Sequence, residues 1–163
     1  LELVAAPTTN LDMRLTLSFQ DSKIVEIGPE DSFLSGAVEG DTMPGAADFL
    51  ASFDLNYLWE LSSPWDLLGQ LGVQYVGDSP NRFSNGTATG EPNPDFAIND
   101  SYTNVNASLS LLKDQWMISL YAQNLTNNDN IILNTGAMVL ASGANRYITL
   151  RPRAIGLRVN YSF

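Results

Sequence analysis

The chain has 163 residues, 44% of them hydrophobic, and a formal net charge of −10, so it is long enough for one domain. This acidity argues against a nucleic-acid partner, which requires a basic footprint on the protein. Cysteine and histidine are both absent. Their absence excludes disulfides and thiolate metal sites, and removes the commonest general base and nitrogen ligand of transition metals.

Alternating apolar and polar residues predict the first two strands, because successive side chains of a strand point to opposite faces. A short strand is expected over 1–6 and a second over 11–25, with a turn at 7–10 that Pro and Asn favour. A long loop rich in Gly, Pro and acidic residues follows at 26–47. Its carboxylates match no calcium-loop motif, so a solvated loop is favoured over a calcium site.

The strand expected over 48–62 has the clearest alternation. Its apolar side contains Phe49, Ala51, Phe53, Leu55, Tyr57, Trp59 and Leu61. A strand of a soluble protein averages only about five or six residues in total, so this strand is unusually long. A tight turn at 63–66 leads to a fourth strand over 67–83, and a second long loop follows at 84–99.

Two further strands are expected over 100–112 and 116–125, joined by a short turn at 113–115. A third long stretch follows at 126–145. The apolar triplets Ile131–Leu133 and Met138–Leu140 within it could extend the preceding hairpin.

The last strand, expected over 146–163, alternates without a break and ends on an aromatic residue. One face carries Ile155, Leu157, Val159, Tyr161 and Phe163. A soluble sandwich strand would alternate too, but a terminal Phe beside a free carboxylate is poorly buried there. This ending is typical of the closing strand of an outer-membrane β-barrel, which has aromatic residues at the membrane interface.

Two regularities of the whole chain predict an all-β fold, an antiparallel transmembrane β-barrel segment in which helix is nearly absent. The polar face is dominated by Asn, Gln, Ser, Thr and Gly, which suits a wet barrel lumen. Short turns also alternate strictly with long loops, as periplasmic turns and extracellular loops do in such barrels. The polar residues expected to face the lumen are Arg14, Asp54, Asn56, Glu60, Asn104, Asn106, Gln123 and Arg158.

Four stretches of the sequence carry a family resemblance. Tyr121 to Asn127 looks like the penultimate-strand motif of TonB-dependent outer-membrane receptors, an aromatic residue followed by Asn-Leu-Thr. Arg151 to Arg158 looks like their Arg-Pro-Arg entry to the last strand, with Ile155 where an aromatic residue is more usual. Met43 to Ala46 is similar to a loop-to-strand junction, and residues 7–20 to a hairpin, of these barrels. Together they make the chain resemble the C-terminal portion of the family's β-barrel.

The resemblance implies that the chain belongs to a larger barrel, of about 22 strands with a plugged lumen. Residues 1–163, with about seven strands, would form the C-terminal part of the barrel domain without the plug, through which the TonB complex acts. The implied location is the outer membrane of a Gram-negative cell. Open strand edges would leave backbone amides unpaired in lipid, so the segment is expected to be stable only with the remaining strands.

No catalytic site is expected. Asp54 and Glu60 share a face, but six residues of strand separate them by about 20 Å, too far for joint acid–base work on one bond. No phosphate-binding pattern or other cofactor motif occurs. Four residues near the loop ends are candidates for contact with a ligand: Arg82, Phe83, Phe96 and Arg146. The two arginines suit an anionic group, such as a phosphate of lipopolysaccharide.

Three functions fit this pattern. The favoured one is the wall of an active-transport receptor that takes up a scarce small molecule, such as siderophore-bound iron, with TonB-supplied energy. The alternatives are a small passive pore or adhesin barrel, and a soluble ligand-binding β-sandwich. Outer-membrane lipid and lipopolysaccharide would surround the wall. The terminal strand would also be recognised by the barrel assembly machinery through strand pairing. Its outward residues are Leu157, Val159, Tyr161 and Phe163.

Overall fold

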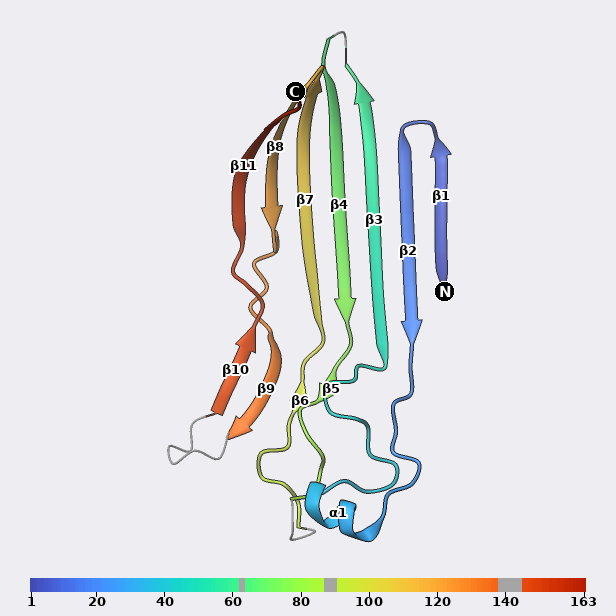
Figure 1. The fold of residues 1–163 in the computed structure, drawn as a ribbon, viewed down its shortest axis with the longest axis vertical. Helices are drawn as coiled ribbons and strands as arrows, with labels where there is room; N and C mark the ends of the chain where they lie inside the picture. Colours follow the sequence, from blue (N-terminus) through green and yellow to red (C-terminus); the bar gives the residue numbers. More distant parts are fainter. Residues whose placement is uncertain (62–63, 87–90, 138–144) are drawn as a thin grey trace.

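The computed structural model describes residues 1–61, 64–86, 91–137 and 145–163. Its main feature is an antiparallel sheet of seven strands in the order β1-β2-β3-β4-β7-β8-β11 (Figure 1). These strands are β1 (Glu2–Thr8), β2 (Leu11–Phe19), β3 (Phe49–Glu60), β4 (Asp66–Val76), β7 (Tyr102–Lys113), β8 (Trp116–Gln123) and β11 (Ala154–Tyr161). The predicted all-β fold with about seven strands is confirmed. The sheet is open, with β1 and β11 at its edges.

The register of the central strands separates apolar from polar side chains. No shift interrupts the pairing from β2 through β3 and β4 to β7. One row across these strands contains Leu15, Phe53, Val73 and Val105, and the adjacent row contains Thr16, Ser52, Gln74 and Asn104. A slip by one residue would exchange the two faces of a strand, so this register keeps the apolar residues together.

The apolar face of the sheet is not covered by other parts of the described chain. Leu120 and Leu157 on this face are 53% and 68% exposed, and the buried hydrophobic residues of the described chain, Ala37 and Ala47, belong to the first long loop. A soluble β-sandwich would pack this face against a second sheet. The exposed apolar face therefore favours the barrel interpretation over the sandwich.

The first long loop contains a short helix, α1 (Pro29–Ser35), which the sequence analysis did not predict. Local end signals explain it. Pro29 occupies the first turn, acidic residues follow it, and Gly36 ends the helix with a φ of 74°. Seven residues are too few to show an amphipathic period. One helix of seven residues in the described chain agrees with the expectation that helix is nearly absent.

Two strands end earlier than expected, because their continuations pair within the loops. The strand predicted to reach Val25 stops at Phe19, after which Ile24 and Met43 donate backbone hydrogen bonds to Asp41 and Ser22 inside the first loop. The strand predicted to reach Phe83 stops at Val76. The chain beyond it forms a small separate sheet of β5 (Ser79–Pro80) with β6 (Ile98–Asn99).

The last predicted strand is divided in two. Residues 145–149 form β10 (Asn145–Thr149), which pairs with β9 (Ile131–Ala137), and β11 begins only at Ala154. Pro152 lies in the gap, and it has no backbone N–H to give to a ladder. Ile131–Leu133 lies in β9 and so extends the hairpin as expected, although in a separate sheet. Met138–Leu140, and Ser63 of the turn predicted at 63–66, lie outside the described residues.

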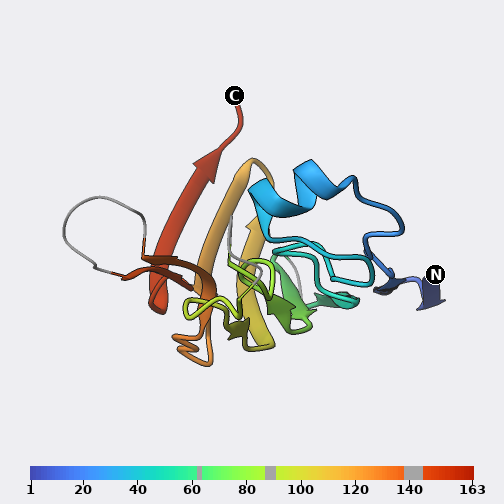
Figure 2. The same cartoon turned by 90° about the horizontal axis from the view of Figure 1, so that it is seen from below.

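The two ends of the sheet differ in the length of their connections. The short turns from β1 to β2 and from β7 to β8 lie at one end, and the long loops with α1, β5 and β6 lie at the other (Figure 1). Figure 2 shows that the sheet is curved and that α1 lies on its concave side. No helix in the described ranges has the length and apolar character needed to cross a membrane.

Candidate functional site

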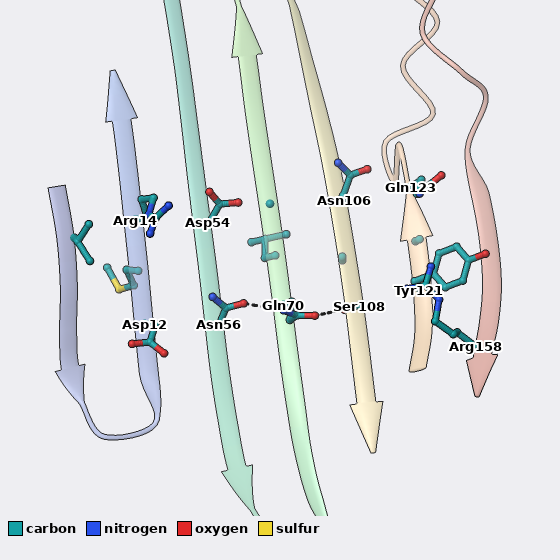
Figure 3. A pocket seen from close by; sticks show the side chains of 16 residues that line it. Asp12, Arg14, Asp54, Asn56, Gln70, Asn106, Ser108, Tyr121, Gln123 and Arg158 are labelled. Atoms are coloured by element: carbon teal, nitrogen blue, oxygen red, sulfur yellow. Dashed lines mark hydrogen bonds between the residues drawn. The ribbon is translucent and has the colours of Figure 1, made fainter. Parts of the chain in front are cut away.

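The concave face carries a polar hollow of about 810 Å³ (Figure 3). Its polar lining comes from β2, β3, β4, β7, β8 and β11, and consists of Asp12, Arg14, Asp54, Asn56, Gln70, Asn106, Ser108, Tyr121, Gln123 and Arg158. Six of these are among the eight residues that the sequence places on the lumen face. The remaining two, Glu60 and Asn104, are on the same strands but outside the lining. The role of all eight as lumen residues stays a prediction.

A chain of side-chain hydrogen bonds crosses the floor of this hollow. Gln70 Nε2 donates to Asn56 Oδ1 at 3.0 Å, and Ser108 Oγ donates to Gln70 Oε1 at 3.1 Å. The three residues are cross-strand neighbours on β3, β4 and β7. Gln70 and Ser108 were not among the predicted site residues, although the alternation of their strands already put them on the polar face.

The hollow has one arginine on each side, Arg14 on β2 and Arg158 on β11. Arg14 lies opposite Asp54 in the ladder, but within the described chain its ion pair is with Glu2 of β1, at 3.6 Å and largely exposed to solvent. Such an exposed pair contributes at most about 1 kcal/mol. At the other side, the Arg158 guanidinium lies 5.5 Å from the centre of the Tyr121 ring. Tyr121 in turn covers Gly156, where a Cβ would collide with the phenol oxygen.

The two predicted lumen residues outside the hollow lie toward opposite ends of the sheet. Asn10 Nδ2 donates to Glu60 Oε1 at 3.4 Å near the short turns. Asn104 lies nearer the long loops, and its side-chain oxygen is buried without a hydrogen-bond partner in the described structure. Glu60 thus accepts a hydrogen bond from a residue of the first short turn, whereas the side-chain oxygen of Asn104 accepts none in the described structure.

Asn124 joins the end of β8 to the third long loop. It has a φ of 47°, a left-handed conformation that Asn tolerates better than most residues. Its side-chain Nδ2 donates to the backbone oxygens of Asn128 at 2.7 Å and Arg151 at 2.8 Å. Asn124 belongs to the aromatic–Asn-Leu-Thr motif at the end of this strand, and the motif alone predicts no contact for its side chain.

The apolar face has aromatic clusters toward both ends. Toward the long loops, the Phe49 ring centre is 4.7 Å from that of Phe19 and 5.8 Å from that of Tyr75. The clusters toward the short turns contain Tyr57 with Trp59, and Trp116 with Tyr161 and Phe163. All four predicted strand-pairing residues, Leu157, Val159, Tyr161 and Phe163, are exposed.

A smaller cavity of about 330 Å³ lies between the first and second long loops. Three of the four predicted ligand-contact residues, Arg82, Phe83 and Phe96, line it. Arg82 Nη1 is 3.3 Å from Asp95 Oδ2. Ser84 Oγ donates to Asp41 Oδ1 at 3.2 Å, which joins the two loops. Arg146 lies on β10, outside this lining.

Comparison with protein families identifies the chain. The family model described as TonB dependent receptor-like, beta-barrel, matches residues 2–125. No curated protein gives a significant match. The match spans β1 to β8 and so covers most of the two-faced sheet. The chain therefore belongs to the TonB-dependent receptor-like β-barrel family.

Proposed function

We propose that the chain is a wall segment of an outer-membrane receptor that takes up a scarce ligand, siderophore-bound iron or a similar compound, with energy supplied through TonB. The family match supports a receptor barrel segment, since this family comprises outer-membrane transport receptors of Gram-negative bacteria rather than enzymes. The observation that carries the proposal is the curved sheet with a polar hollow on its concave face and exposed apolar residues on the other.

The dimensions of the apolar face support a membrane location. Phe49 and Trp59 lie ten residues apart on β3, in the aromatic clusters at opposite ends. Ten residues at about 3.4 Å span about 34 Å along the strand. A strand tilt of about 40° reduces this to about 26 Å, close to the apolar band of about 25 Å in outer-membrane barrels.

We further propose that residues 1–163 are part of a larger barrel domain. In the described chain β1 and β11 are edge strands, with backbone groups available for further pairing. In lipid, unpaired groups would cost several kcal/mol each, so additional strands are needed at both edges. A plug inside the completed barrel would lie against the polar hollow and would provide the contact with TonB.

The loop cavity is the proposed place of ligand contact in this segment. Phe83 and Phe96 supply apolar surface, and Arg82 supplies a cation that Asp95 holds in place. Ligand pockets commonly combine apolar walls with a few fixed polar groups, as this cavity does.

Uptake measurements with the full-length receptor test the proposal. Cells that express it as their iron receptor are given ⁵⁵Fe bound to a hydroxamate, a catecholate or citrate, with and without a functional tonB gene. We expect accumulation of one chelate that is lost without TonB. Accumulation that does not depend on TonB, together with steady conductance in planar bilayers, would establish the passive pore instead. No uptake of any chelate would refute the iron assignment.

A further inference from the structure

The loop cavity has more negative than positive charge in its lining. Among the described residues, the lining contains the carboxylates of Asp41, Asp48 and Asp78 but only one guanidinium, that of Arg82. Arg82 Nη1 lies 3.3 Å from Asp95 Oδ2, so the charge of this arginine is already balanced within the protein. The cavity as a whole therefore favours a cationic group, whereas Arg82 considered alone favours an anionic one.

Two of these carboxylates belong to a row of aspartates across the sheet. The backbone hydrogen bond from Gly77 to Phe49 continues the β3–β4 ladder beyond its last pair, and the same register places Asp48 opposite Asp78. The β4–β7 and β5–β6 ladders share one register, which places Asp78, between them, opposite Asp100. Opposite side chains lie about 5 Å apart, and like charges in such positions destabilise a sheet. Uncharged residues would avoid this cost.

The charge of the aspartate row is not compensated within the part of the chain that the structure describes. There, the side chains of Asp48, Asp78 and Asp100 form no ion pair and no hydrogen bond, and all three residues are exposed. The backbone of Asp48 is nevertheless fixed, because its carbonyl accepts a 3.0 Å hydrogen bond from the N–H of Gln20. These carboxylates are thus held in place and accessible to an external cation.

The two loops around the cavity contain nearly all of the net charge of the protein. Residues 20–48 and 77–101 contain eleven acidic and two basic residues, hence a net charge of −9, whereas the whole chain has −10. A surface region with one sign of charge attracts ligands of the opposite sign and repels those of the same sign. The loops therefore favour the approach of cations and oppose that of anions.

The apolar part of the cavity limits which cation fits. Phe96 and Ile98 are 40% and 50% exposed, and they line the same cavity as Asp48 and Asp78. Aromatic rings also attract cations through their faces. The volume of about 330 Å³ is close to the lower limit of about 300 Å³ for ligand pockets, so the cavity suits one arm of a chelate. An ammonium group on an alkyl arm combines the required charge with an apolar stem.

We propose that the loop cavity binds an alkylammonium group of the transported ligand, so that the receptor prefers a cationic ferric hydroxamate to a neutral one and rejects anionic chelates. The alkyl arm would lie against Phe96 and Ile98, and the ammonium group would contact Asp48 and Asp78. This inference rests on the uptake function proposed above, and it adds the charge of the ligand, which the family match does not provide.

Two ferric chelates that differ in one charge test this inference. Ferrioxamine B is a hydroxamate chelate with a pendant ammonium group, and N-acetylation of its amine gives a neutral chelate of similar shape. Cells with the full-length receptor as their iron receptor take up each ⁵⁵Fe chelate at about 0.15 M ionic strength, which screens charges beyond about 8 Å. An exposed ion pair changes affinity by up to about fivefold, so two carboxylates should make the half-saturating concentration of the ammonium form about tenfold lower.

Charge-removing variants locate the effect. Asp48→Asn combined with Asp78→Asn should raise the half-saturating concentration of the ammonium chelate about tenfold and leave that of the acetylated chelate unchanged. Asn has nearly the same shape as Asp and relieves the repulsion in the row, so folding is retained. Glu26→Gln combined with Glu30→Gln is the matched control, because both are exposed carboxylates of the first long loop outside the cavity lining. The control should take up both chelates like the wild type.

The outcomes separate this inference from the uptake function. Equal half-saturating concentrations of the two chelates, an unchanged value in the Asp48/Asp78 variant, or an equal rise in the control would overturn the inference. TonB-dependent uptake of ferric citrate or a ferric catecholate, both anionic, without uptake of the ammonium chelate would refute the preferred charge and leave the uptake function intact. No uptake of any of these chelates would refute the iron-uptake function and this inference together.

Discussion

The side-chain amide of Asn124 donates a 2.8 Å hydrogen bond to the backbone carbonyl of Arg151 and thereby ties the end of β8 to the entry of β11. The same side chain holds Asn128 in both directions, because Nδ2 donates to its carbonyl and Oδ1 accepts from its N–H at 2.9 Å. Asn124 is only 4% exposed. One buried residue therefore satisfies three backbone groups where two strands and a loop meet.

Asn124→Ala should lower the free energy of unfolding of the full-length receptor by about 2–4 kcal/mol, because it leaves buried backbone groups unpaired and places Ala in a left-handed conformation. Asn124→Gly removes the hydrogen bonds without the backbone strain and should cost less. Urea unfolding in detergent micelles, followed by tryptophan fluorescence, measures both. Equal stability of Asn124→Ala and the wild type would contradict the assigned role.

Adjacent residues of β7 distinguish the two faces. Leu109 is 49% exposed on the apolar face, whereas Ser108 lines the polar hollow. In the proposed membrane, Leu109→Arg should destabilise the barrel by about 2 kcal/mol, since it puts a charge into the hydrocarbon region. Ser108→Arg should cost less than about 1 kcal/mol, the value of one hydrogen bond. The temperature at which the folded full-length receptor loses its distinct migration in a gel compares the stability of the two variants. A similar loss of stability in both variants would argue against a lipid-facing Leu109.

Phe96→Ala tests the loop cavity. If Phe96 contacts the ligand, the half-saturating concentration of the transported chelate should rise about tenfold, the usual size for loss of an aromatic anchor. Phe33→Ala is the matched control, because Phe33 is an exposed aromatic residue of the first long loop outside the cavity lining. Concentration-dependent ⁵⁵Fe uptake measures both variants. An unchanged value for Phe96→Ala, or an equal rise for Phe33→Ala, would place the ligand elsewhere.

Deletion of Phe163 tests the proposed strand-pairing signal. The Phe163 ring lies 5.3 Å from that of Tyr161 and is fully exposed, so little folded-state packing is lost with it. We expect a several-fold lower level of full-length receptor in the outer membrane, because the assembly machinery loses part of its recognition strand. Quantitative immunoblots of membrane fractions measure this, with Ser162→Ala as the control. Equal surface levels would rule out a role for Phe163 in insertion.

The sequence predicted the seven-stranded sheet well because both faces of its strands have distinct chemistry. On β3, a side-chain period of two separates Phe53 and Leu55 from Asp54 and Asn56, and the observed register preserves that separation. The same alternation predicts the polar face on which the hollow lies. The larger barrel was predicted from the family resemblance, because alternation alone does not imply it.

The loops were predicted less well, because their structure depends on contacts between distant residues. The early end of β2 depends on backbone pairing of Ile24 with Asp41, which no local pattern reveals. The hydrogen bond between Ser84 and Asp41 likewise joins two loops 43 residues apart in sequence. By contrast, Pro29 and Gly36 did mark the ends of α1, and the division of the last strand could have been predicted from Pro152.

The unshifted ladder from β2 to β7 also limits how this protein can move. Sliding one strand past its neighbour would break its backbone hydrogen bonds and, after one residue, turn apolar side chains toward the polar, concave face. We therefore expect the strands of this segment to keep fixed positions relative to one another. In the proposed uptake, a change that follows ligand binding would then occur in the loops, or in a plug on the concave face, while β3 and β4 keep their positions.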